Sequence, residues 1–143
     1  MDLQEDAYHE LCAYTLQRGD VGFIHQHVVN AFAAQRATAG SKPIAVAFSL
    51  AGLYLHVEKG FSGREVQRAH MRLARQKKRV WPAFVLPADR GAITASDVMK
   101  APPGAIRDDA IDKWCASVWG AFTANRGAIV EFLEPYGLVR ESG

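Results

Sequence analysis

The chain has 143 residues, of which 49% are hydrophobic and 22% are charged, and its formal net charge is +2. This length is enough for one domain that buries roughly two-thirds of its unfolded surface without help from disulfides. The two cysteines, Cys12 and Cys115, form no CxxC motif, and the acidic N-terminus does not resemble a signal peptide. We therefore expect a single domain over residues 1–143, in the reducing cytoplasm, with free thiols.

The positive charge is concentrated in one part of the chain. Residues 1–61 carry four basic and six acidic side chains, and residues 91–143 carry five and seven. Residues 62–90 carry eight basic and two acidic side chains, which is a local charge of +6. The excess belongs to one predicted helix and the segment that follows it.

Two helices are predicted before residue 40. The first covers residues 2–17, with acidic side chains near its N-terminus, where the helix dipole favours them. Gly19 and Asp20 form a turn, and Asp20 is a good N-cap for a second helix that runs to about residue 37.

The stretch 43–57 predicts the helix around which the others pack. It has no charged residue, begins with Pro43 and is followed by Gly60, which suit the start and the end of a helix. Its apolar residues lie on all sides, as in a helix that is covered all round. It is shorter than the roughly 18–20 apolar residues that cross a membrane, so we expect no membrane contact. One line of this helix holds small residues and ends in a histidine: Ala45, Ser49, Gly52 and His56.

A capping box marks the start of the next helix. Ser62 and Glu65 have the spacing of reciprocal caps, so the helix is expected to begin at Gly63. His70 lies on its inner, apolar face. Its outer face carries four arginines: Arg64, Arg68, Arg72 and Arg75.

The second half of the sequence predicts an apolar strap and three further helices. Prolines keep residues 80–93 extended, and Trp81 and Phe84 should pack on the helices. A short helix begins after Thr94, a long one begins near Asp108, and the last covers about 127–134. The expected fold is therefore all-α: an antiparallel bundle of four main helices, with extra short helices and the strap.

The histidines suggest a metal site. All five lie in the first 70 residues, and antiparallel packing places them in one half of the bundle at two depths. Helical bundles build metal sites from inward side chains, and imidazole suits zinc, iron or nickel. We therefore predict a divalent-metal site, with or without catalytic activity, whose ligands are His9, His27, His70 and next His56. The alternative is that these histidines only pack in the core, since no HExxH motif or i,i+4 histidine pair is present.

The arginines suggest a second class of function, a non-enzymatic interaction module. The row of Arg64, Arg68, Arg72 and Arg75 could meet an acidic partner or phosphates, with Trp81 stacking on a base. The net charge of only +2 makes nucleic acid the less favoured partner, and a homodimer through an apolar surface is a further alternative. A simple solvated face also explains the row. No nucleotide-binding glycine loop or GxSxG motif is present, so the sequence assigns no catalytic residue and no substrate.

Three segments resemble a bacterial family of small helical domains of unknown function. They are YHELCAYTL at 8–16, FIHQHVV at 23–29 and LHVEKGFSG at 55–63. The similarity continues through Trp81-Pro82 and residues 114–119, and it implies no activity. A looser analogy is the DinB-like bundles, which bind metal through three histidines from different helices, but their histidine spacing is absent here.

Overall fold

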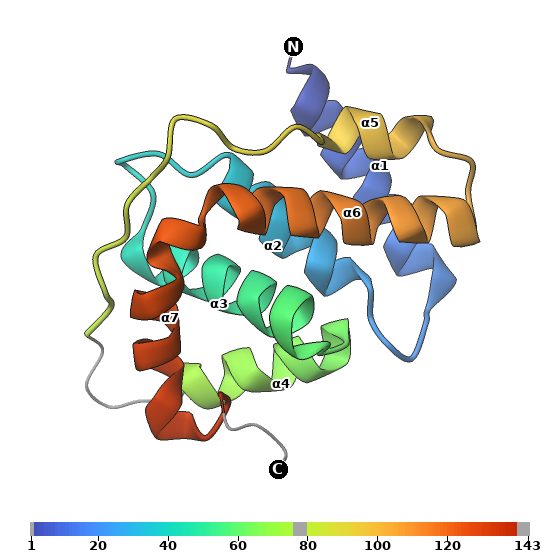
Figure 1. The fold of residues 1–143 in the computed structure, drawn as a ribbon. Helices are drawn as coiled ribbons and strands as arrows, with labels where there is room; N and C mark the ends of the chain where they lie inside the picture. The colour runs from blue at the N-terminus through green and yellow to red at the C-terminus, as the bar shows by residue number, and fades with distance from the viewer. Residues whose placement is uncertain (1, 76–79, 140–143) are drawn as a thin grey trace.

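The computed structural model describes residues 2–75 and 80–139, and within these ranges it contains helices and no strand. The all-helical class is therefore confirmed (Figure 1). The elements are α1 (Leu3–Arg18), α2 (His25–Gln35), α3 (Pro43–Lys59), α4 (Gly63–Ala74), α5 (Ala95–Lys100), α6 (Ala105–Ala121), η1 (Thr123–Asn125), α7 (Arg126–Leu133) and η2 (Glu134–Tyr136). The finer expectation, four main helices in antiparallel order, stays a prediction.

Local sequence signals determine several helix ends. Asp2 accepts hydrogen bonds from the backbone N–H groups of Gln4 and Glu5 and so caps α1. Both halves of the predicted capping box are present at the start of α4, where Ser62 and Glu65 bond to each other's backbone N–H groups. A side-chain cap of this kind stabilises a helix by about 1 kcal/mol.

Helix α3 is the central element, as predicted. It lies beside α2 and α6 and also contacts α4 and α7, and its residues 49–55 are all buried (Figure 1). The line of small residues permits a close approach of α2, because a Cβ atom at Gly52 would lie 2.1 Å from Nδ2 of Asn30. Contact at such a distance is sterically forbidden, so this packing requires glycine.

The start of α2 differs from the prediction. The helix begins at His25, and Asp20 does not cap it but accepts a hydrogen bond from the N–H of Ile24 inside the preceding turn. Phe23 has a positive φ of 56°, which is rare for a residue other than glycine. The loop is held against α4, where a Cβ atom at Gly63 would lie 1.8 Å from the Phe23 carbonyl oxygen. The loop conformation, which the sequence pattern does not reveal, removes four residues from the expected helix.

The strap runs over the helices without regular secondary structure from residue 80 to residue 94. Trp81 is half-buried, with its ring in edge contact with the rings of Phe48 and Phe132. The Asn125 side chain bonds to both the N–H and the carbonyl of Val85 at 2.7 and 2.8 Å. These contacts attach the strap to α3 and to the C-terminal helices.

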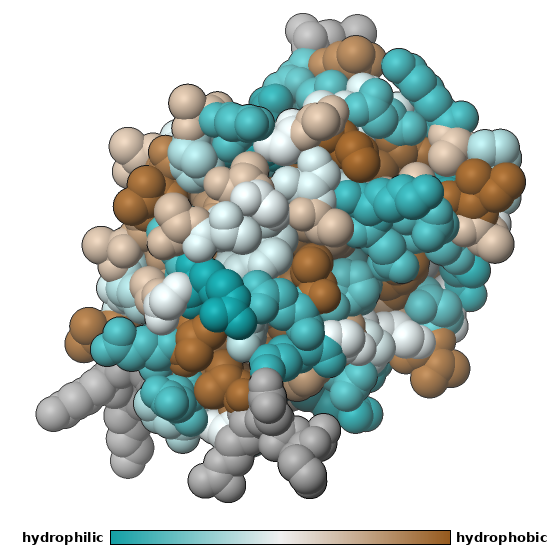
Figure 2. Space-filling view, viewed as in Figure 1, coloured by the Kyte–Doolittle hydropathy of each residue, from teal (hydrophilic) through white to brown (hydrophobic). Residues whose placement is uncertain are grey.

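The surface shown in Figure 2 carries small apolar patches separated by hydrophilic residues. In the part of the chain that the structure describes, no helix has the length and apolar character needed to cross a membrane. A homodimer through an apolar surface stays a prediction.

Candidate functional site

Two of the predicted metal ligands meet in the structure. His27 in the first turn of α2 stacks on His56 in the last turn of α3, with ring centroids 3.5 Å apart and planes 20° apart. Asp112 of α6 completes the cluster, with its Oδ1 3.0 Å from Nε2 of His56. The consecutive helices α2 and α3 and the distant helix α6 thus contribute one side chain each.

His56 is held between two hydrogen-bond acceptors. Its Nδ1–H donates to the Phe61 carbonyl at 2.8 Å, and its Nε2 faces the Asp112 carboxylate. Burial disfavours the charged imidazolium, but the hydrogen bonds to Asp112 and Phe61 outweigh this effect and raise the pKa of His56. The same hydrogen bond lowers the pKa of Asp112. The contact between His56 and Asp112 is an ion pair whenever His56 is protonated, with one proton in the hydrogen bond between them.

His27 differs from His56 in its hydrogen bonding and in the direction of its pKa shift. Only 4% of it is exposed, and within residues 2–75 and 80–139 no hydrogen bond of its ring is found, although its nitrogens are not among the fully buried unpaired atoms, which are Nδ2 of Asn30 and the hydroxyl of Tyr136. Burial, with a contribution from the nearby charge of His56, lowers its pKa to about 3. His27 is therefore a neutral imidazole at physiological pH, and one ring nitrogen has a lone pair that nothing in the described structure uses.

A small pocket of about 170 Å³ opens at this cluster. Ligand sites for drug-sized molecules are usually larger than about 300 Å³, so this pocket suits an ion, water or a very small molecule. One wall is the loop that carries the positive φ of Phe23, a kind of backbone strain that clusters at functional sites. The pocket is lined by Asp20, Gly22, Ile24, His27, His56, Ser62, Gly63 and Asp112.

The other predicted metal ligands lie elsewhere. His9 is exposed on α1. His70 stacks on Phe48, and its Nε2–H donates to the Phe48 carbonyl at 2.8 Å, so it has the partner that a packing histidine needs. The four-histidine set therefore does not converge on one point. Across the two described ranges, no group of three or more His, Cys, Asp or Glu side chains is arranged to hold a metal ion.

The predicted arginine row is present on α4. Arg68 and Arg75 are exposed, Arg64 lies over the ring of Phe23, and Arg72 donates a hydrogen bond to the Tyr136 carbonyl. The row therefore begins beside the loop that walls the histidine pocket and runs along α4 to the Tyr136 carbonyl.

Asp112 is the functional candidate that the sequence did not reveal. It lies beside the apolar stripe of α6, 56 residues after the histidine that it bonds, and it belongs to no recognisable motif. The Phe61 carbonyl, which orients His56, is a backbone group that carries no sequence signal at all.

Comparison with known proteins gives a family and no activity. The model of a family of unknown function, DUF5946, matches residues 5–123. The chain belongs to this family. The matched residues contain His27, His56 and Asp112, and the similarity noted from the three sequence motifs is thereby confirmed at the level of the family. Curated proteins and solved structures yield no match.

Proposed function

We propose that this protein binds a divalent transition-metal ion at His27, His56 and Asp112. The observation that carries the proposal is a buried, neutral imidazole that has no hydrogen bond to a described residue and packs against a histidine–carboxylate pair at the edge of a pocket. Two imidazoles and one carboxylate are a common ligand set for zinc, iron and nickel.

The spacing of His56 and Asp112 supports this chemistry. Ligand atoms that each lie about 2.0–2.2 Å from one ion are about 3.0–3.6 Å apart, and Nε2 and Oδ1, 3.0 Å apart, lie at the short end of this range. A metal ion could therefore take the place of the proton that the pair shares. Histidines that bind metals usually donate their other N–H to a carbonyl or carboxylate, as His56 does to Phe61.

As they stand, these three side chains are not arranged around an ion, so His27 must turn for the ion to bind. Two rings stacked 3.5 Å apart with planes only 20° apart cannot both direct an in-plane lone pair at one ion about 2 Å away. Metal binding is therefore expected to break the stack, while the Asp112 side chain, 57% exposed, has room to follow. Three protein ligands would leave a coordination position open to the pocket, which is typical of catalytic rather than structural zinc sites. A cytoplasmic location belongs to the same proposal, since both cysteines are free.

The test is a Co²⁺ titration of untagged, metal-free protein, followed by visible absorption. We expect one equivalent of Co²⁺ to bind, and binding to be lost in His27→Ala and in Asp112→Asn. His70→Ala and His9→Ala are the matched controls and should bind as the wild type does. Absence of cobalt absorption in the wild type, or its retention in His27→Ala, would refute the proposal.

A further inference from the structure

The arginines of the α4 row differ from three arginines elsewhere in the molecule. Three arginines elsewhere form ion pairs: Arg18 with Asp108, Arg36 with Asp2, and Arg126 with Glu58. None of the ion pairs found among the described residues involves Arg64, Arg68, Arg72 or Arg75. The acidic residue on α4, Glu65, is bonded to the backbone of Ser62 in the capping box. The basic row is therefore not neutralised by this part of the chain.

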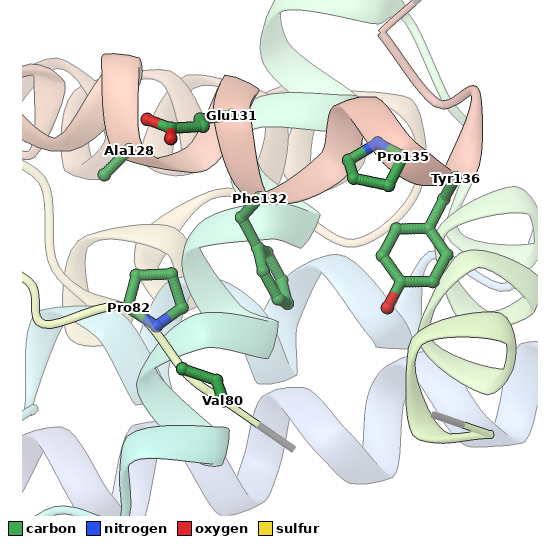
Figure 3. A pocket seen from close by; sticks show the side chains of 7 residues that line it. All are labelled: Val80, Pro82, Ala128, Glu131, Phe132, Pro135 and Tyr136. Atoms are coloured by element: carbon green, nitrogen blue, oxygen red, sulfur yellow. The ribbon is translucent and has the colours of Figure 1, made fainter. Parts of the chain in front are cut away.

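An apolar groove of about 390 Å³ lies between the start of the strap and the C-terminal helices (Figure 3). Phe132 and Tyr136 point from α7 and η2 toward the strap, where Val80 and Pro82 face them. The complete lining is Val80, Pro82, Ala128, Glu131, Phe132, Pro135 and Tyr136.

The groove and the basic row are adjacent. Arg72 donates a hydrogen bond to the carbonyl of Tyr136, so one edge of the groove lies against α4. Val80, which lines the groove, is 80% exposed, and Met71, next to Arg72 in the sequence, is 53% exposed. An apolar hollow with an arginine at its edge that forms no ion pair with the described residues has the composition expected of a recognition surface, where arginine is enriched.

We propose that this surface binds an acidic polypeptide segment that carries an apolar side chain. The apolar side chain occupies the groove, and the carboxylates of the segment meet Arg68, Arg72 and Arg75. Charge complementarity selects the partner, because uncompensated guanidinium groups favour carboxylates and attract them over a distance.

A polypeptide is a better match than a nucleic acid. Trp81, which the sequence suggested as a base-stacking residue, is held in edge contact between Phe48 and Phe132. Prolines and an aliphatic residue contribute to the groove, and Glu131 at its rim would repel phosphates. The same carboxylate orients the segment, whose acidic residues must lie toward α4 and away from α7.

The test uses fluorescein-labelled synthetic peptides with Asp and Glu on both sides of one Leu, Phe or Trp, measured by fluorescence anisotropy. We expect binding that weakens as salt rises and weakens again when the apolar residue is replaced by Ser. The pair Arg68→Glu and Arg72→Glu should lower the affinity by at least about tenfold. A second pair, Arg68→Gln and Arg75→Gln, keeps the structural hydrogen bond from Arg72 to Tyr136. This pair should stay folded and should also weaken peptide binding, which separates loss of charge from loss of structure.

The matched control is the pair Lys100→Glu and Lys113→Glu, which changes the net charge by the same amount on other helices. It should bind the peptides as the wild type does, and chelators should have no effect, which separates this result from the metal site. Failure of every peptide to bind, equal loss in the lysine control, or arginine-dependent binding of a single-stranded oligonucleotide in place of the peptides would overturn the proposal.

Discussion

Two histidines, His27 and His70, are both packed against an aromatic ring, and they have different roles. His70 stacks on Phe48 and donates a hydrogen bond to a carbonyl, so the local structure satisfies it. His27 stacks on a second histidine and has no such partner among the described residues, although burial keeps it neutral. Burial therefore does not distinguish a packing histidine from a binding histidine. The two are distinguished by whether the ring nitrogens have hydrogen-bond partners.

The largest effect should come from Gly63→Ala, which lies where α4 meets the loop beside the His27 pocket. A Cβ atom there would lie 1.8 Å from the Phe23 carbonyl oxygen, so the loop that walls the pocket must move. We expect a loss of about 3 kcal/mol or more in the free energy of unfolding, measured by urea denaturation. The ring resonances of His27 should change and those of His70 should not. A variant as stable as the wild type would show that the loop is not clamped in this way.

Acidification should reveal the neutral state of His27. The pKa of His27 is about 3 in the folded protein and about 6.5 in the unfolded chain. Between these values the unfolded chain binds a proton at His27 and the folded protein does not. Stability should therefore fall between pH 6.5 and pH 3, by roughly 1 kcal/mol per pH unit from this group. His25 and His70, whose pKa values burial also lowers, act in the same direction. His56 acts in the opposite direction: its raised pKa stabilises the fold fully below pH 6.5, and this contribution is lost only as the pH rises above that value.

Urea denaturation across this pH range, with chelator present, gives the measurement. The variant His27→Phe keeps an aromatic ring and should show a shallower slope than the wild type. The exposed His9→Phe is the control and should leave the slope unchanged. Equal slopes in all three proteins would mean that His27 is protonated in the folded state.

Replacing His27 or His70 with phenylalanine at neutral pH measures how much each side chain contributes to stability. His70→Phe removes the hydrogen bond from His70 to the Phe48 carbonyl, so it should cost about 1–1.5 kcal/mol. His27→Phe loses no hydrogen bond to a described residue, so in metal-free protein its effect should stay within about 1 kcal/mol. The free energy of unfolding at neutral pH tests both, and the reverse order would contradict the assigned roles.

The smallest effect concerns thiol labelling near the site. Cys115 is buried behind α2, with its thiol 3.7 Å from the His27 carbonyl, and burial raises its pKa. Cys12 is only partly buried, although burial also raises its pKa. A thiol reagent should label Cys12 slowly and Cys115 only after unfolding. Early labelling of Cys115 would show that the site opens in the native protein.

Local signals predicted much of the fold and little of the site. The cap at Ser62 and the uncharged run of α3 were read correctly because both depend on neighbouring residues. The pairing of His27 with His56 was missed because α2 was expected to begin near residue 21, which placed His27 too deep. A loop whose conformation depends on contact with Gly63 replaces that first turn.

The predicted and observed sites also differ at His9 and Asp112, for two separate physical reasons. The buried face of α1 is formed by Ala7, Leu11 and Thr15, and His9 lies nearly opposite to it, so the helical period alone could have excluded that residue. Asp112 could not have been found in this way, because its contact with His56 depends on how α6 packs against α3.

The most direct test is a histidine-selective ¹H–¹⁵N spectrum of metal-free protein at neutral pH, repeated after addition of Zn²⁺. We predict that His56 is doubly protonated and His27 neutral before Zn²⁺ is added. With Zn²⁺, both rings should shift and His70 should keep its resonances. A charged His27 in the metal-free protein, or Zn²⁺ that perturbs His70 and leaves His27 unchanged, would contradict the distinction between the two histidines.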